Sequence, residues 1–161
     1  MDSGLRICRA TEADVPLILA FVHKIAKYEK LSHAVVATED TLRVSLFGPR
    51  PAAEVLLAYW NGSAAGYAVF FESFSTFEGR AGVYLEDLFV EPELRGKGIG
   101  KALLKTVAQA AKDRNCSRLE WSVLDWNTPA IEFYRSLGAK PMEEWTIFRM
   151  TRDAIDKLAG D

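Results

Sequence analysis

One stretch constrains the fold more than any other: residues 83–100, which read VYLEDLFVEPELRGKGIG. An apolar run typical of a buried strand is followed by a turn and by three glycines at the entry to a predicted helix. A helix start offers unpaired backbone N–H groups and the positive end of the helix dipole, and glycines let a phosphate approach the main chain there. We therefore predict a strand, a pyrophosphate cradle and a helix in this order.

The glycine spacing excludes two common phosphate loops. A nucleoside triphosphate loop reads Gly-x4-Gly-Lys-Ser/Thr, and no Lys-Ser/Thr pair follows Gly96 at the required place. A dinucleotide fingerprint reads Gly-x-Gly-x-x-Gly, whereas the glycines here are Gly96, Gly98 and Gly100. From the residues alone, two interpretations stay open: a cradle for another pyrophosphate compound such as coenzyme A, and a plain helix start after a tight turn.

Composition and charge narrow the partners. The 161 residues are 49% hydrophobic and 26% charged, which is typical of one globular domain spanning residues 1–161. The net charge of -2 provides no electrostatic footprint for nucleic acid. No apolar run approaches the roughly 20 residues that cross a bilayer, and the N-terminus has no signal-peptide pattern. We expect a cytoplasmic protein that binds neither nucleic acid nor a membrane.

Few residues are suited to metal or redox chemistry. Cys8 and Cys116 lie far apart and form no C-x-x-C pair. His23 and His33 are the only histidines, which makes a histidine-based metal site or a Ser-His-Asp triad improbable. We therefore expect no metal, and chemistry that depends on carboxylates and tyrosines.

Hydrophobic periodicity and turn signals predict six strands and five helices. The predicted strands are 5–9, 54–60, 66–74, 83–90, 118–124 and 145–150, and the predicted helices begin near residues 11, 38, 98, 127 and 152. Asn61-Gly62 is a strong hairpin signal between the second and third strands. This order predicts one α+β domain in three layers, with a mixed, mostly antiparallel sheet of six to seven strands flanked by helices.

Several motifs together carry a family resemblance. Tyr84–Val90 precedes Arg95–Gly100, and both are followed by Leu124-Asp125-Trp126-Asn127 and by Phe133-Tyr134. In order and spacing these motifs resemble the GCN5-related N-acetyltransferases (GNATs), and within them the diamine and thialysine N-acetyltransferase branch. The resemblance covers nearly the whole chain. It implies the GNAT fold, acetyl-CoA as cosubstrate, a small-molecule amine as acceptor, and a homodimer.

Acetyl transfer to an amine requires a proton acceptor and a proton donor. A primary ammonium has a pKa of about 10.4 and must lose a proton before it attacks. The resemblance implies that Glu86 meets the amine and relays its proton. It also names Tyr134 as the general acid for the departing thiolate. By strand alternation we expect Asp87 to point to the face opposite Glu86.

The same resemblance implies two sets of binding residues. The cofactor-binding residues would be Leu88, Phe89, Val90, Arg95, Gly96, Lys97, Gly98, Ile99, Gly100, Lys101, Asn127, Ala130 and Tyr134. The substrate-binding residues would be Tyr28, Glu29 and Glu86. Each assignment has an alternative interpretation without a function. Glu86 would be a solvated acid on an exposed strand, Tyr134 a packed aromatic residue, and the segment around Tyr28 and Glu29 a charged helix end.

The acceptor is less constrained than the cosubstrate. Ser75–Arg80 is similar to the corresponding loop of thialysine-type members, and Thr76 takes a position that is acidic in polyamine-specific members. This favours a lysine analogue with a thioether, or a short diamine. The alternatives are a spermidine or spermine acetyltransferase, an acetyltransferase for peptide or protein amines, and a non-catalytic acyl-CoA-binding regulatory module.

Overall fold

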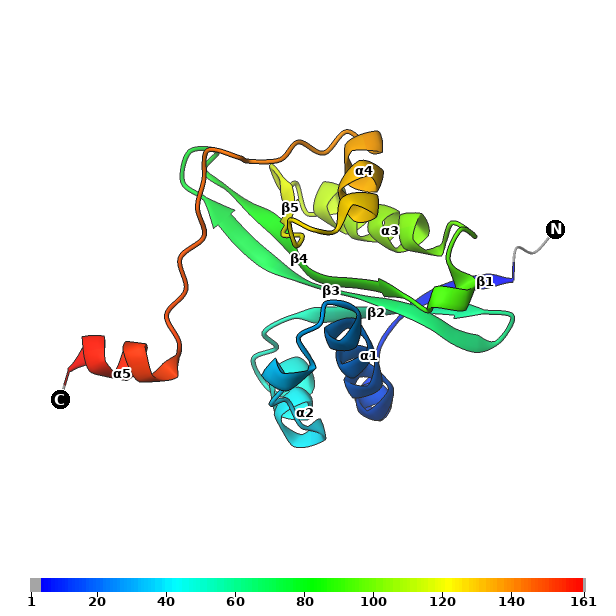
Figure 1. The fold of residues 1–161 in the computed structure, drawn as a ribbon, viewed down its shortest axis with the longest axis horizontal. Helices are drawn as coiled ribbons and strands as arrows, with labels where there is room; N and C mark the ends of the chain where they lie inside the picture. The colour runs from blue at the N-terminus through cyan, green and yellow to red at the C-terminus, as the bar shows by residue number, and fades with distance from the viewer. Residues whose placement is uncertain (1–3, 161) are drawn as a thin grey trace. The chain divides into compact units, whose positions relative to one another are not determined.

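A computed structural model describes residues 4–160. These residues form two compact units, one that ends at Ser122 and one that begins at Val123. The first unit contains a sheet with the strand order β1-β2-β3-β4-β5 (Figure 1). The interpretation of the whole chain as a single domain stays a prediction.

Five strands build this sheet in the described residues. They are β1 (Leu5–Arg9), β2 (Glu54–Trp60), β3 (Ser63–Ser75), β4 (Arg80–Val90) and β5 (Leu119–Trp121). Neighbours from β1 to β4 are antiparallel, and β5 runs parallel to β4. The predicted hairpin turn is confirmed, because Asn61 and Gly62 both have the positive φ that a tight two-residue hairpin turn requires.

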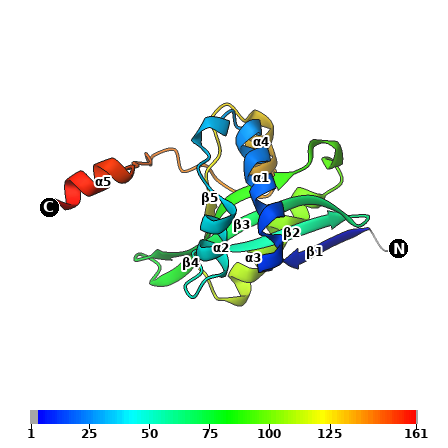
Figure 2. The ribbon, with the colours of Figure 1, turned by 90° about the horizontal axis from the view of Figure 1, so that it is seen from below.

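Helices cover both faces of the sheet in the first unit. They are α1 (Val15–Tyr28), α2 (Glu39–Phe47) and α3 (Ile99–Asp113), with short 3-10 turns η1 (Glu12–Asp14), η2 (Ser32–Ala34) and η3 (Pro92–Leu94). Figures 1 and 2 show α1 and α2 on one face and α3 on the other. The predicted start of the first helix is confirmed, since Asp14 accepts a hydrogen bond from the Thr11 backbone N–H at 2.7 Å.

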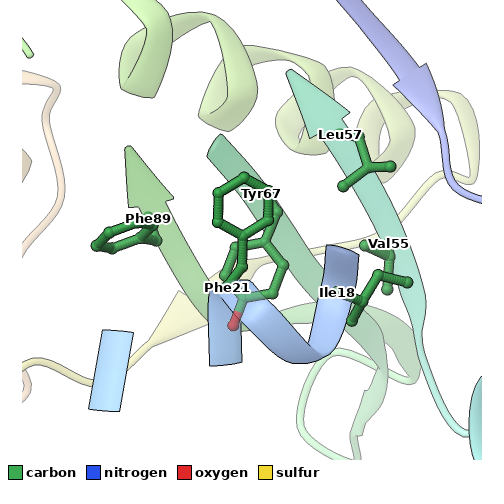
Figure 3. Packing of buried hydrophobic residues seen from close by; sticks show 6 residues of the cluster. All are labelled: Ile18, Phe21, Val55, Leu57, Tyr67 and Phe89. Carbon is green, nitrogen blue, oxygen red and sulfur yellow. The ribbon is translucent and has the colours of Figure 1, made fainter. Parts of the chain in front are cut away.

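An apolar cluster fills the space between α1 and the sheet. Figure 3 shows its side chains, which come from α1, β2, β3 and β4: Ile18, Phe21, Val55, Leu57, Tyr67 and Phe89. The ring of Phe21 stacks on Tyr67 with centroids 5.2 Å apart and lies 6.0 Å from Phe89. Truncating a buried aromatic side chain typically costs about 3–5 kcal/mol of stability. This cluster therefore anchors α1 to the end of β4 that leads into the glycines.

β4 contains a bulge that the sequence pattern does not predict. Val69 of β3 pairs with Asp87, but the next residue, Phe70, pairs with Leu85. Glu86 is thus one extra residue on β4, and a bulge of this kind breaks the alternation of side chains along the strand.

The second unit contains two helices, α4 (Thr128–Ser136) and α5 (Arg152–Ala159). The strand predicted at 145–150 is wrong, because this segment has no strand pairing in the described residues. Its apolar side chains, among them Trp145, Ile147 and Phe148, are exposed. Aromatic and β-branched residues favour a strand, but a strand also needs a neighbouring edge that supplies hydrogen bonds. The α+β class and the mixed, mostly antiparallel sheet are confirmed, with five strands instead of six to seven.

Candidate active site

The predicted cradle lies between β4 and α3. Gly96 has a φ of +78° and Gly98 a φ of +83°, a region that side-chain-bearing residues rarely adopt. A Cβ at either position would meet nothing within 4 Å, so both glycines border open space. Gly98 is the N-cap of α3, and no side chain caps this helix start. Backbone N–H groups at an uncapped helix start fit an anion such as a pyrophosphate.

The other cradle residues differ in what they do. Ile99 is buried at 1% exposure and anchors the first turn of α3. Gly100 has no positive φ, and a Cβ there would make an ordinary 3.6 Å contact with Val90 Cγ2, so its backbone does not require glycine. Lys97 and Lys101 are exposed cations, and Lys97 Nζ lies 5.7 Å from the centroid of the Trp60 ring.

Arg95 directs its side chain away from the glycines. Its Nε donates a hydrogen bond to the carbonyl oxygen of Val90 at 3.0 Å. Its guanidinium carbon lies 4.7 Å from the centroid of the Tyr28 ring and 5.6 Å from that of Phe89. Arg95 thus joins the end of β4 to the end of α1.

A cleft of about 400 Å³ opens at this junction. Its lining comes from the last turns of α1 and from the segment after β4: Lys24, Lys27, Tyr28, Phe89, Glu91, Pro92 and Arg95. Two of these lining residues, Lys24 and Glu91, form an ion pair. The cleft brings the predicted substrate residue Tyr28 beside the predicted cofactor residues Phe89 and Arg95.

Three carboxylates interact near the bulge of β4. Burial raises the pKa of Glu29 above the ordinary glutamate value of 4.5, and the negative charges of Asp87 and Glu86 raise it further. The two predicted substrate carboxylates, Glu29 and Glu86, are therefore within electrostatic reach of each other. Like charges held together disfavour ionisation, so a cation that enters among these carboxylates is stabilised and lowers the pKa of Glu29.

The prediction that Asp87 points to the face opposite Glu86 by strand alternation is wrong. Both side chains act on Glu29, because the bulge removes the alternation on which that prediction depended. Asp87 is half-buried, whereas Glu86 is exposed. Glu86 is thus more accessible to solvent than Asp87.

A buried tyrosine holds Asp87. The Tyr67 hydroxyl donates a hydrogen bond to Asp87 Oδ2 at 2.5 Å, and Tyr67 is 0% exposed. Burial raises the pKa of Asp87 above 3.8, and this hydrogen bond opposes the rise. Burial, followed by the charge of Asp87, raises the pKa of Tyr67 far above its ordinary value, so the phenol stays a neutral donor. Sequence reasoning missed this pair, although a tyrosine inside an apolar strand signals that its hydroxyl needs a partner.

The remaining predicted residues belong to α4 in the second unit. The helix predicted to begin near residue 127 is confirmed, because Asn127 is the N-cap of α4; it is buried at 8% exposure, and its side chain makes no capping hydrogen bond. Pro129 occupies the first turn, where its missing backbone N–H leaves no helical hydrogen bond unmade. Ala130 and Tyr134 are half-buried, and the Tyr134 ring lies 5.6 Å from that of Phe133. The role of Tyr134 stays a prediction.

Residues 4–160 contain neither a metal-binding cluster of side chains nor a membrane-spanning helix. No group of three or more His, Cys, Asp or Glu side chains could hold a metal ion in that range. His23 and His33 are exposed, and both cysteines are free. No helix there is long and apolar enough to span a bilayer.

Comparison with known proteins gives concordant results. A family profile described as the acetyltransferase (GNAT) family matches residues 23–139. The chain is 41% identical to a thialysine N-epsilon-acetyltransferase of Bos taurus, over 96% of both chains. It is 34% identical to an L-ornithine N5-acetyltransferase of Arabidopsis thaliana, over 95% of this chain and 88% of that protein. An integron cassette protein from V. cholerae superposes with a TM-score of 0.81 at 28% identity, covering 98% and 99% of the two chains. This chain belongs to the acetyltransferase (GNAT) family.

Proposed function

We propose that this protein transfers the acetyl group of acetyl-CoA to a primary amine of a small molecule that carries a second polar or cationic group. The observation that carries the proposal is a cluster of three carboxylate side chains, those of Glu29, Glu86 and Asp87. Glu86 and Asp87 lie on the strand that leads into the cradle, and Glu29 lies at the adjoining helix end. The relatives named as thialysine and ornithine acetyltransferases support an amino acid with a side-chain amine as the acceptor.

The cradle residues would hold the cosubstrate. The N–H groups at the start of α3 would bind its pyrophosphate, and the backbone of Leu88, Phe89 and Val90 would bind the pantetheine arm. Lys97 and Lys101 would add positive charge. Bound acetyl-CoA supplies a thioester, whose carbonyl carbon accepts the amine nitrogen as the C–S bond breaks.

Glu86 would prepare the amine. It is exposed at the bulge, and as a carboxylate it accepts the ammonium proton, directly or through one water, before the C–N bond forms. Glu29 and Asp87 would bind the second charged group of the acceptor, and Tyr28 would form the wall beside them.

Tyr134 would complete the transfer by donating its phenolic proton to the thiolate. A phenol with a pKa near 10 is a weaker acid than a thiol near 8.5, so this step requires a site that lowers the tyrosine pKa. Asn127 and Ala130 would bind the cosubstrate from the same helix. General acid catalysis of this kind typically contributes about 10²–10⁴ in rate.

A substrate panel tests the acceptor class. Thialysine, putrescine, spermidine and a histone-like peptide are compared by thiol release at saturating acetyl-CoA. We expect the highest kcat/KM for thialysine or putrescine. A preference for the peptide would overturn the small-molecule assignment, and no turnover of any amine would favour a non-catalytic acyl-CoA-binding module.

Tyr134→Phe tests the proton donor. We expect kcat to fall by about 10² or more while the KM for the amine changes little. Tyr59→Phe, a tyrosine of β2 outside the proposed site, is the matched control. An unchanged kcat in Tyr134→Phe would remove the acid role.

One observation favours a second acceptor class. Asp87 adds a third carboxylate to the two that the resemblance implied, and several carboxylates suit several cations. Thr76 is exposed in the turn between β3 and β4, where polyamine-specific relatives of the resembled branch place an acid. The three carboxylates thus favour a polyamine and Thr76 disfavours one, and the kcat/KM for spermidine in the panel distinguishes the two. The homodimer and the cytoplasmic location stay predictions.

A further inference from the structure

The side chain of Arg95 contacts α1. Arg95 precedes Gly96 directly, yet its guanidinium lies over the Tyr28 ring, with the carbon 4.7 Å from the ring centroid. Its Nε is held by the Val90 carbonyl oxygen at 3.0 Å. A planar guanidinium that stacks on a ring and donates from Nε makes two contacts that a lysine cannot reproduce together.

The far end of this contact belongs to the amine side of the proposed site. Tyr28 is the last residue of α1. The next residue, Glu29, is the C-cap of the helix and belongs to the cluster of three carboxylates. The ion pair between Lys24 and Glu91 ties the preceding turn of α1 to the same segment after β4. Two charged contacts thus join the last turns of α1 to the entrance of the cradle.

The Arg95–Tyr28 contact is open to solvent. Arg95 is exposed and Tyr28 is 38% exposed, so neither side chain is fixed by burial. A contact of this kind gains order when either end is immobilised. A ligand that orders one end reduces the entropy that a second ligand must remove at the other end.

We propose that Arg95 is a positioning residue that couples the two binding sites, so that a pyrophosphate in the cradle strengthens amine binding at the Tyr28–Glu29 end of α1. The coupling is reciprocal, because each ligand must change the affinity of the other by the same factor. This inference rests on the proposed function, since it takes an amine as the ligand of the cluster of three carboxylates.

Calorimetry tests the coupling without turnover. The Kd of coenzyme A is measured with and without saturating thialysine, and the Kd of thialysine with and without coenzyme A. For the parent protein we expect each ligand to lower the Kd of the other about fivefold. A factor of one in the parent protein would overturn the proposal.

Variants separate coupling from plain phosphate binding. Arg95→Lys keeps the charge but loses the planar stack, and Tyr28→Leu removes the ring while leaving the cradle intact. We expect the coupling factor to fall to about one in both variants and to fall no further in the double variant. Tyr28→Phe keeps the ring and is expected to restore the coupling.

Lys101→Ala is the matched control. It removes an exposed cation from the first turn of α3, so it is expected to weaken coenzyme A binding and to leave the coupling factor unchanged. If Arg95→Lys behaves like Lys101→Ala, Arg95 is a phosphate ligand only and the proposal is wrong. Coupling lost in Arg95→Lys but no turnover of any panel amine would instead refute the proposed function alone. Thermal unfolding of each variant verifies that it is folded.

Discussion

Tyr67→Phe removes a single oxygen atom from the centre of the first unit. The ring stacks on Phe21 at 5.2 Å between centroids, and phenylalanine preserves that packing. What disappears is the donor of the 2.5 Å hydrogen bond to Asp87. The variant therefore isolates one polar contact in an otherwise apolar core.

The magnitude follows from the charge of the acceptor. A hydrogen bond to a charged group contributes about 1.5–3 kcal/mol, and its loss leaves the half-buried carboxylate of Asp87 short of a partner. We expect a loss of about 2 kcal/mol in the free energy of unfolding at pH 7.5. For a chain of this length that corresponds to a decrease in Tm of about 6 °C.

The loss should depend on pH in one direction. Burial raises the folded-state pKa of Asp87 above its ordinary value of 3.8, and the Tyr67 hydrogen bond counteracts this. The folded state therefore binds more protons than the unfolded state between 3.8 and the raised pKa, and stability falls as pH rises through that interval. Without Tyr67 the pKa of Asp87 rises further and the interval extends upward. The difference between parent and variant is largest above this interval and smallest below pH 3.8.

Urea unfolding at pH 7.5 and at pH 4 measures both quantities. Other titrating groups contribute equally to parent and variant, so they cancel in the difference. Tyr59→Phe, which removes a hydroxyl outside the Asp87 contact, is the control and should show no such pH dependence. Equal losses at the two pH values, or a Tyr67→Phe protein as stable as the parent at pH 7.5, would refute the reasoning.

Two further variants test an ion pair of the sheet and the glycine cradle. Hydrogen bonds from Arg114 at 2.6 and 2.8 Å, together with Arg9, lower the pKa of Glu54. We expect Glu54→Gln to lose about 1 kcal/mol of stability at pH 7. That loss should disappear as pH falls through the lowered pKa of Glu54. Urea unfolding at pH 3 that still shows the full loss would contradict this prediction. Gly98→Ala forces a side chain into a φ of +83°, at about 1–2 kcal/mol, and places a methyl group in the cradle. Its KM for acetyl-CoA should rise about tenfold in steady-state assays, whereas Gly79→Ala, with a φ of +64° and equally open space, should carry strain but leave that KM unchanged.

The elements that the sequence predicted well are those with local signals. The helix predicted to begin near residue 11 is confirmed, because its N-terminal hydrogen bond between Thr11 and Asp14 and its buried residues at helical spacing, such as Val15 and Ile18, are all local in sequence. The hairpin turn follows from Asn61 and Gly62, whose conformations need no distant partner. The uncapped, glycine-lined start of α3 likewise follows from residues within one turn of each other.

The elements that were missed depend on partners distant in sequence. Tyr67 and Asp87 are 20 positions apart, and their contact exists only because β3 and β4 pair in one register. β4 begins at Arg80 instead of Val83 for the same reason, since its pairing with β3 extends to Ser75. The segment at 145–150 shows the converse, because its pattern is that of a strand and it has no paired edge in the described structure.

The two neighbouring acids of β4 show why a local pattern could not assign their roles. Alternation treats Glu86 and Asp87 as equivalent residues on opposite faces, and the bulge makes them unequal in a different way. Asp87 is half-buried and held by a buried phenol, whereas Glu86 is the extra, exposed residue. A carboxylate that exchanges protons with an incoming amine must be reachable, and one that maintains a fixed negative charge benefits from a donor that never ionises. The register of β3 against β4 therefore favours Glu86 for proton transfer and Asp87 for binding.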